Sequence, residues 1–179
     1  MTPQQTSFLK TVIPAALACE KLNPVPPACI TIAQAILESG WGKASIGNNL
    51  WGIKCYDPKT PTNPNAWGCE ERQTFEYVNG AKTPTVAKFQ LFPTPLDAVQ
   101  QHAAIFKHPD YLQLRAALSV SGWRGFAQLL GPQVDSEGHV IPGQPPRYST
   151  APTYGAEIIT LVEDYGLDDQ SALARIMTA

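Results

Sequence analysis

The hydrophobic periodicity of this chain changes twice, and the change limits the folds open to it. Apolar side chains recur every three to four residues over 4–22 and again over about 28–39, which predicts two helices. Residues 74–92 alternate instead, around a turn signal at 78–81, which predicts a β-hairpin with one packed face. Helical spacing returns over 96–107, 111–118, 123–130 and about 153–165. The sequence therefore predicts a mainly α (α+β) protein: a helical domain with one small β-hairpin lobe.

Length and composition fit a single globular domain. We expect residues 1–179 to form one domain, with its core over about 8–165 and a short C-terminal tail at 166–179. The 17 prolines are about twice the average usage of roughly 5%, but they gather in loops. A net charge of −2 gives no reason to expect a nucleic-acid partner. No apolar run approaches the roughly 18 to 20 residues that span a bilayer, and no signal peptide is visible at the N-terminus.

The four cysteines have no spacing typical of a zinc site, and we expect no metal. Proximity in the sequence favours two disulfides, Cys19–Cys29 across a helix-helix turn and Cys55–Cys69 around a loop rich in Pro and Asn. The alternative is four reduced, partly buried thiols. The loop 56–68 is a candidate lid or cleft wall.

One carboxylate stands at the end of the second expected helix. Glu38 is followed by Gly40, a plausible left-handed C-cap, and Trp41, and it shares a helix face with Gln34 one turn earlier. A carboxyl beside apolar side chains and an indole loses hydration, which raises its pKa and suits it to donate a proton. Lysozyme has such a glutamate, which lies in an apolar pocket against a tryptophan and acts as the general acid. The alternative is a structural acid that accepts hydrogen bonds from the following loop.

The stretch AQAILESGWGKASIGNNLWGIKC, residues 33–55, resembles the signature of glycoside hydrolase family 73, the bacterial cell-wall N-acetylglucosaminidases. The family pattern has an apolar helix, Ala-x-Glu-Ser-x-Trp-Gly, a spacer, and Asn-Asn-Leu-Phe-Gly-Ile-Lys. The sequence departs from it at Ile36-Leu37 and at Trp51, where Phe is usual. The segment 74–106 resembles the family's hairpin and following helix, and YSTAPTY at 148–154 resembles its Tyr-Ala-Thr-Asp-Pro-x-Tyr, with Ala151 where Asp is usual.

The resemblance implies a lysozyme-like fold and a peptidoglycan hydrolase that cleaves the β-1,4 bond between N-acetylglucosamine and N-acetylmuramic acid. It implies Glu38 as general acid, Glu76 as the assisting carboxylate and Tyr148 as a positioning group. It implies no cofactor, and its partners would be peptidoglycan glycan strands. Candidates for substrate binding are Trp51, which could equally be a core residue, Asn49, which could instead hold its loop, Tyr154 and Gln34.

Other functions remain open at this level. The same fold with Glu38 could serve a muramidase or a lytic transglycosylase, and a glycan-binding module whose catalysis has lapsed is a third possibility. Glu76 could act as the base of an inverting reaction, or the substrate's acetamido group could act as internal nucleophile. We expect a monomer that acts in the periplasm or the extracellular cell wall. It could be an autolysin, a phage lysin or an interbacterial effector, and an effector would require an immunity protein in the producing cell.

Overall fold

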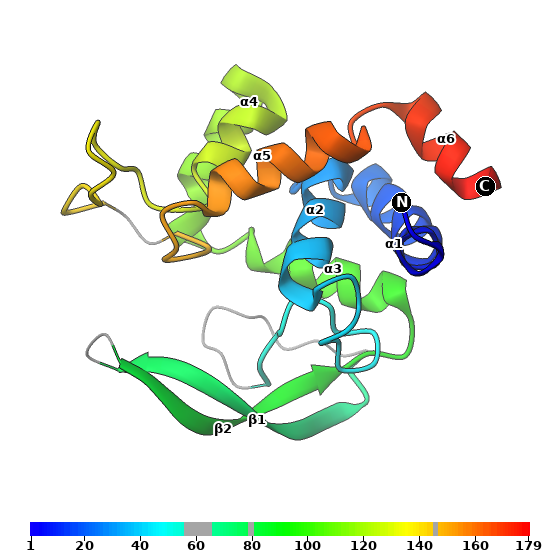
Figure 1. Ribbon diagram of the computed structural model, residues 1–179, viewed down its shortest axis with the longest axis horizontal. Coiled ribbons are helices and arrows are strands. Elements are labelled where there is room, and N and C mark those ends of the chain that lie inside the picture. The colour runs from blue at the N-terminus through cyan, green and yellow to red at the C-terminus, as the bar shows by residue number, and fades with distance from the viewer. Residues whose placement is uncertain (56–65, 79–80, 145–146) are drawn as a thin grey trace.

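The computed structural model describes residues 1–55, 66–78, 81–144 and 147–179, without the side chains of 75–78 and 81–82. Helices lie above and a two-stranded hairpin below in the view of Figure 1, with both chain ends on one side of the helical body. The elements in order are α1 (Pro3–Leu22), α2 (Ala28–Ser39), β1 (Gly68–Val78), β2 (Ala81–Leu91), α3 (Pro95–Ile105), a 3₁₀ turn (Pro109–Tyr111), α4 (Leu112–Gln128), α5 (Tyr154–Tyr165) and α6 (Gln170–Thr178).

Helix α2 is the centre of the helical body, because it packs against α1, α3, α4 and α5. Its side chains are buried on nearly every face, and Ile30, Ile32 and Ala33 have no exposed surface. The helix ends at Gly40, which adopts the left-handed conformation at φ 56° and ψ 49° and donates its N–H to Ile36 O. The expected bounds and cap of this helix are confirmed. The cap ends the helix two residues after Glu38, so Glu38 lies in its last turn.

The hairpin is confirmed and is longer than the alternation suggested. Its strands are antiparallel from the pair Gly68 and Leu91 to the pair Val78 and Ala81. Residues 53–55 pair with the far end of β2, where Gln90 N donates to Ile53 O at 2.9 Å and Cys55 N donates to Lys88 O at 2.8 Å. The loop that follows α2 and the hairpin are therefore joined by backbone hydrogen bonds.

The third and fourth helices follow the expected pattern closely. Thr94 caps α3 through a capping box with Asp97, as the Thr-Pro start indicated. The two short helices expected over 111–118 and 123–130 correspond to the two parts of α4, which are separated by a sharp break at Gly122, whose φ is 62° and ψ −159°. Helix α5 starts at Tyr154, and its N-cap residue Thr153 makes no side-chain cap hydrogen bond. Within the described ranges, no helix has the length and apolar character to cross a membrane.

Two expectations need correction. The C-terminal tail is not outside the core: it forms α6, which packs on α1 and buries Leu173 and Ile176. Asp169 caps this helix by accepting a hydrogen bond from Ser171 N, a signal that the sequence carried.

Of the two disulfides predicted from the sequence, one is present in the structure. Cys55 and Cys69 form the expected disulfide, whereas Cys19 and Cys29 are both free and buried. Both thiols belong to the hydrophobic core, and Cys29 also lines a surface pocket. The prediction of a Cys19–Cys29 bond was wrong.

Candidate active site

Three polar side chains from α2 and α5 form a hydrogen-bonded chain that ends at Glu38. Gln34 Nε2 donates to Tyr154 Oη at 3.1 Å, and Tyr154 Oη donates to Glu38 Oε1 at 2.5 Å. Gln34 is fully buried, and Tyr154 is 6% exposed. The two α2 residues are one turn apart, as their shared helix face predicted, so a single phenol at the start of α5 contacts both. The arrangement fixes one carboxylate oxygen of Glu38, and no hydrogen bond from a described residue reaches the other.

The close approach of α5 to the end of α4 brings Tyr154 to this position. A Cβ atom at Gly155 would lie 2.6 Å from Ala127 O, a distance that no larger residue could occupy without moving the backbone. Gly131 is equally confined, because a Cβ there would lie 2.9 Å from Ala151 O. These two glycines let the first turn of α5 reach Glu38.

The pKa of Glu38 is raised above its ordinary value. The main cause is loss of hydration, and the hydrogen bond from Tyr154 acts in the opposite direction because it favours the carboxylate. Glu38 keeps contact with solvent where it faces the cleft, while the protein atoms around it remove much of its hydration. A carboxyl that holds its proton at higher pH than usual is suited to act as a general acid.

Tyr148 lies beside this chain, in an aromatic cluster. Its ring stacks on Phe106 with centroids 5.5 Å apart, and it lies 5.7 Å from the ring of Tyr154 and 5.9 Å from that of His102. Burial and the nearby charge of Glu38 raise the pKa of Tyr148 well above its usual range, so its phenol stays protonated. The structure thus brings Glu38, Tyr148 and Tyr154 together from segments more than 100 residues apart in the sequence.

Asn48 and Asn49 join the loop after α2 to the hairpin. Asn49 Nδ2 donates to Ile53 O and Gln90 O, both at 2.9 Å, and its Oδ1 accepts from Ile53 N at 3.0 Å. Asn48 Nδ2 donates to the carbonyls of Phe92 and Pro93. With 2% of its surface exposed, Asn49 has the loop-holding arrangement, and substrate contact by it stays a prediction.

Trp51 packs in the core. It is 5% exposed, and its indole stacks on the imidazole of His102 with centroids 4.6 Å apart. Burial lowers the pKa of His102 to about 3, so this ring is neutral. Of the four candidates for substrate binding, Trp51, Asn49 and Gln34 therefore have buried side chains, and Tyr154 contacts the carboxylate of Glu38. These positions favour support of the site over contact with a sugar.

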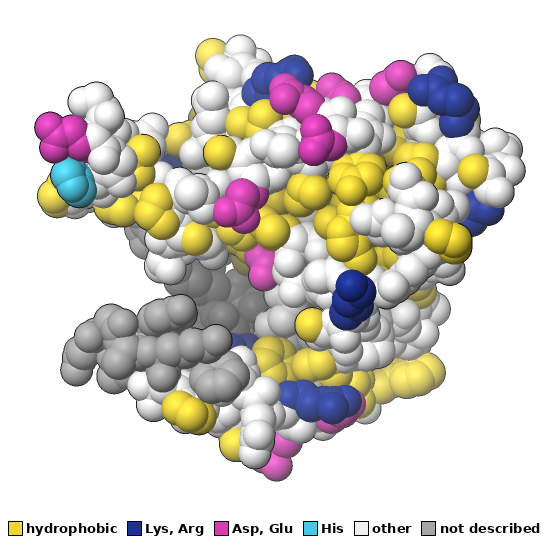
Figure 2. Space-filling model, viewed as in Figure 1, with side chains coloured by type: hydrophobic (Ala, Val, Ile, Leu, Met, Phe, Trp, Pro, Cys, Tyr) yellow, Lys and Arg dark blue, Asp and Glu magenta, His cyan; other side chains and the backbone are white. Residues whose placement is uncertain are grey.

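Glu38 opens into a cleft of about 420 Å³ between the helical body and the hairpin. Figure 2 shows the molecule hollowed between these two parts. The volume falls within the range of roughly 300 to 1,000 Å³ that is usual for ligand pockets. Besides Glu38, its described lining consists of Lys43, Ala44, Ser45, Ile46, Asn49, Leu50, Gly52, Arg72, Gln73, Thr74 and Phe89.

The chain matches the family model described as mannosyl-glycoprotein endo-beta-N-acetylglucosaminidase over residues 13–167. The chain belongs to the glucosaminidase family. Its resemblance to glycoside hydrolase family 73 and its lysozyme-like fold are both confirmed.

Relatives of this glucosaminidase domain carry names of cell-wall hydrolases. It is 29% identical over 162 residues to exo-glucosaminidase LytG of Bacillus subtilis (strain 168), covering 87% of this chain and 49% of LytG. It is 26% identical over 171 residues to a probable N-acetylmuramidase of Lactococcus lactis subsp. cremoris (strain MG1363), covering 89% of this chain and 33% of the relative. The chain thus spans a third to a half of the length of these relatives.

A solved structure supports the fold of the glucosaminidase domain. The catalytic domain of the autolysin Auto from Listeria monocytogenes superposes with a TM-score of 0.69 at 21% identity, covering 93% of this chain and 87% of that one.

Glu76, the second carboxylate expected from the glucosaminidase resemblance, lies in β1 opposite Thr83. Its side chain is outside the described part of the structure. Its position in the strand has the same parity as Arg72 and Thr74, which line the cleft together with Gln73 of the other parity. The role of Glu76 stays a prediction, and so does that of loop 56–68 as a lid, since 56–65 lie outside the described residues.

Lys43 and Arg72 are charged lining residues that the sequence analysis did not identify. Lys43 lies within the signature segment 33–55, whereas Arg72 lies two residues before the segment expected to form the hairpin. Over the residues that the structure describes, no group of three or more His, Cys, Asp or Glu side chains gathers that could hold a metal ion.

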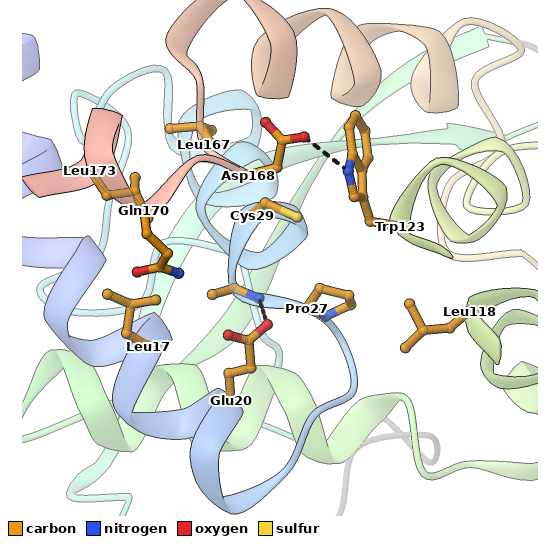
Figure 3. A pocket seen from close by; sticks show the side chains of 11 residues that line it. Leu17, Glu20, Pro27, Cys29, Leu118, Trp123, Leu167, Asp168, Gln170 and Leu173 are labelled. Atoms are coloured by element: carbon orange, nitrogen blue, oxygen red, sulfur yellow. Dashed lines mark hydrogen bonds between the residues drawn. The ribbon is translucent and has the colours of Figure 1, made fainter. Parts of the chain in front are cut away.

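A second, smaller pocket of about 280 Å³ lies away from Glu38, among α1, α2, α4 and α6. Figure 3 shows Cys29 there, with Glu20 Oε1 accepting from Ala28 N at 2.8 Å and Trp123 Nε1 donating to Asp168 Oδ2 at 3.1 Å. Burial raises the pKa of the Cys29 thiol to about 12, so it is protonated and unreactive at neutral pH.

Proposed function

We propose that this chain is an endo-acting β-N-acetylglucosaminidase that cleaves peptidoglycan between N-acetylglucosamine and the following N-acetylmuramic acid. The observation that carries the proposal is the state of Glu38, a carboxyl with a raised pKa, held by Tyr154 and open to a cleft. Membership of the glucosaminidase family supports it, and the description of the family model supports endo action. The name of LytG supports glucosaminidase activity but describes exo action. The substrate lies in the bacterial wall, so the enzyme would act in the periplasm or outside the cell.

Glu38 acts as the general acid. Cleavage of the glycosidic bond leaves negative charge on the O4 atom of the muramyl unit, and a proton from Glu38 neutralises it as the bond breaks. Tyr154 contacts one oxygen of the carboxyl, so the proton is donated from the other. After the proton leaves, the Tyr154 hydroxyl stabilises the carboxylate that forms.

Glu76 and Tyr148 would act on the other side of the scissile bond. If Glu76 activates water, the product has inverted stereochemistry at C1. If the acetamido group of the sugar attacks C1, the product retains its configuration, and the protonated phenol of Tyr148 would orient that group. The anomeric form of the first product, followed by proton NMR during digestion, distinguishes the two routes.

The test of the bond is digestion of purified peptidoglycan, followed by borohydride reduction and mass analysis of the fragments. The proposal predicts reduced N-acetylglucosamine ends from the wild type and none from Glu38→Gln. It also predicts a broad range of fragment lengths, whereas an exo-acting enzyme would release short products from chain ends. Reduced muramic acid ends would contradict the glucosaminidase assignment.

The second candidate is a muramidase, favoured by the name of the Lactococcus lactis relative. It would keep Glu38 as the general acid and change only the position of the sugar units in the cleft. Muramic acid reducing ends would support it, and anhydromuramic ends would indicate a lytic transglycosylase.

A further inference from the structure

Two cationic side chains line the cleft into which Glu38 opens. Lys43 comes from the loop after α2, and Arg72 comes from β1. Both are exposed, and Arg72 retains 55% of its side-chain surface. In the described lining the charged residues are these two cations and Glu38.

The hairpin displays Arg72 on the side of the cleft. Strand residues of equal parity share a face, and Arg72, Thr74 and Phe89 have the register of one face and line the cleft. Gln73, which has the other parity, also lines it. The other face carries Glu71 and Lys88, which pair with each other at 3.6 Å. Arg72 also has an ion-pair partner of equal strand parity, Glu70, so each face of the hairpin pairs its charges.

Among the described side chains Arg72 forms an ion pair with Glu70, which is absent from the described lining of the cleft. A guanidinium has five N–H donors in a planar fork, so one carboxylate leaves donors for a second. No ion pair of Lys43 is found within the described residues. Both cations can therefore bind an additional anion.

A glycan made of N-acetylglucosamine alone carries no charge, so it cannot form ion pairs with these two cations. The muramyl unit differs from it by a lactyl ether, which ends in a carboxylate when the strand carries no peptide. When a peptide is attached, the carboxylates lie further along that peptide. We infer that Lys43 and Arg72 bind a carboxylate borne by the muramyl unit, and that they make the cleft selective for anionic over neutral glycan. This inference rests on the proposed function and specifies its substrate.

The test uses three substrates with the same scissile bond. The first is glycan strands freed of peptide, which carry the lactyl carboxylate. The second is the same strands after carbodiimide coupling to methylamine, which neutralises that carboxylate. The third is strands with their peptides in place. The enzymes are the wild type, the double variant Lys43→Gln/Arg72→Gln, and Lys88→Gln, which removes a cation from the opposite face of the hairpin.

If the lactyl carboxylate is the ligand, the wild type has a kcat/KM roughly tenfold to a hundredfold higher on the first substrate than on the second, the range for a hydrogen-bonded charge pair. If the peptide supplies the carboxylate, the third substrate exceeds the other two instead. In either case the double variant brings the ratio to about one, and Lys88→Gln keeps the wild-type ratio. Added salt lowers the wild-type preference and leaves the double variant unchanged.

Two results would overturn the inference: a wild type that does not distinguish the three substrates, or a double variant that keeps the preference. Either of them leaves the proposed glucosaminidase function intact, because the strands are still cut. Failure of the wild type to cut any of the strands would instead remove the proposed function and this inference with it.

Discussion

Replacement of Tyr154 by phenylalanine tests the hydrogen-bonded chain that holds Glu38. The phenyl ring preserves the packing, so the change is confined to the hydroxyl. Gln34 Nε2 then loses its acceptor in a fully buried site, and Gln34 Oε1 already has no partner among the described residues. A buried polar group left without a partner costs about 1–3 kcal/mol. Glu38 loses less, because water can reach it from the cleft.

We therefore expect Tyr154→Phe to lower the free energy of unfolding by about 1–3 kcal/mol. For a chain of this length, each kcal/mol corresponds to about 2–4 °C in Tm. Urea unfolding followed by circular dichroism measures the change. Tyr165→Phe is the matched control, since Tyr165 lies at the other end of the same helix and its ring packs against Trp41.

A double-mutant cycle separates the buried amide from other effects. In Gln34→Leu/Tyr154→Phe the unpaired amide is gone, so the double variant should be more stable than the sum of the single changes predicts. The reasoning would be refuted if Tyr154→Phe unfolds at the same urea concentration as Tyr165→Phe, or if the two single changes simply add.

Three further predictions concern the acid, the loop and the disulfide. The Tyr154 bond lowers the pKa of Glu38, so Tyr154→Phe should move the alkaline limb of the pH profile of kcat/KM to higher pH; an unmoved limb would contradict this assignment. Asn49→Ala should destabilise by about 2–4 kcal/mol in urea unfolding, since three buried bonds are lost, and Asn48→Ala by less; equal costs would count against the loop-holding role. Cys55→Ser/Cys69→Ser should cost about 3 kcal/mol, because the bond closes a loop with a sequence separation of 14, and an unchanged Tm under dithiothreitol would argue against it.

Local sequence patterns predicted most of the secondary structure. Helix α2 has the expected bounds because its apolar run, the prolines before it and Gly40 after it all act within a few residues. The hairpin follows from alternation around a short turn in the same way. Helix α6 was missed although Asp169 caps it, because a nine-residue amphipathic segment at a chain end gives a weak periodic signal.

The site depended on contacts that no local pattern encodes. The shared helix face of Gln34 and Glu38 was visible in the sequence, but their common partner Tyr154 lies 116 residues beyond Glu38. Tyr154 entered as a candidate for substrate binding through the family motif, and the structure shows its hydroxyl hydrogen-bonded to the carboxylate of Glu38; its contact with substrate stays a prediction. Arg72 was missed for a similar reason, since only the packing of the hairpin against the loop after α2 brings it to the cleft.

The role of Glu38 as general acid is tested most directly by the initial rate at which Glu38→Gln releases reducing ends from purified peptidoglycan. Glutamine keeps an oxygen that can accept from Tyr154, so the variant isolates the loss of the proton donor. We predict a rate about 10²- to 10⁴-fold below that of the wild type. Glu71→Gln, the same substitution at an exposed carboxylate on the opposite face of the hairpin, should match the wild type. A Glu38→Gln enzyme that works within a few-fold of the wild-type rate would contradict the account.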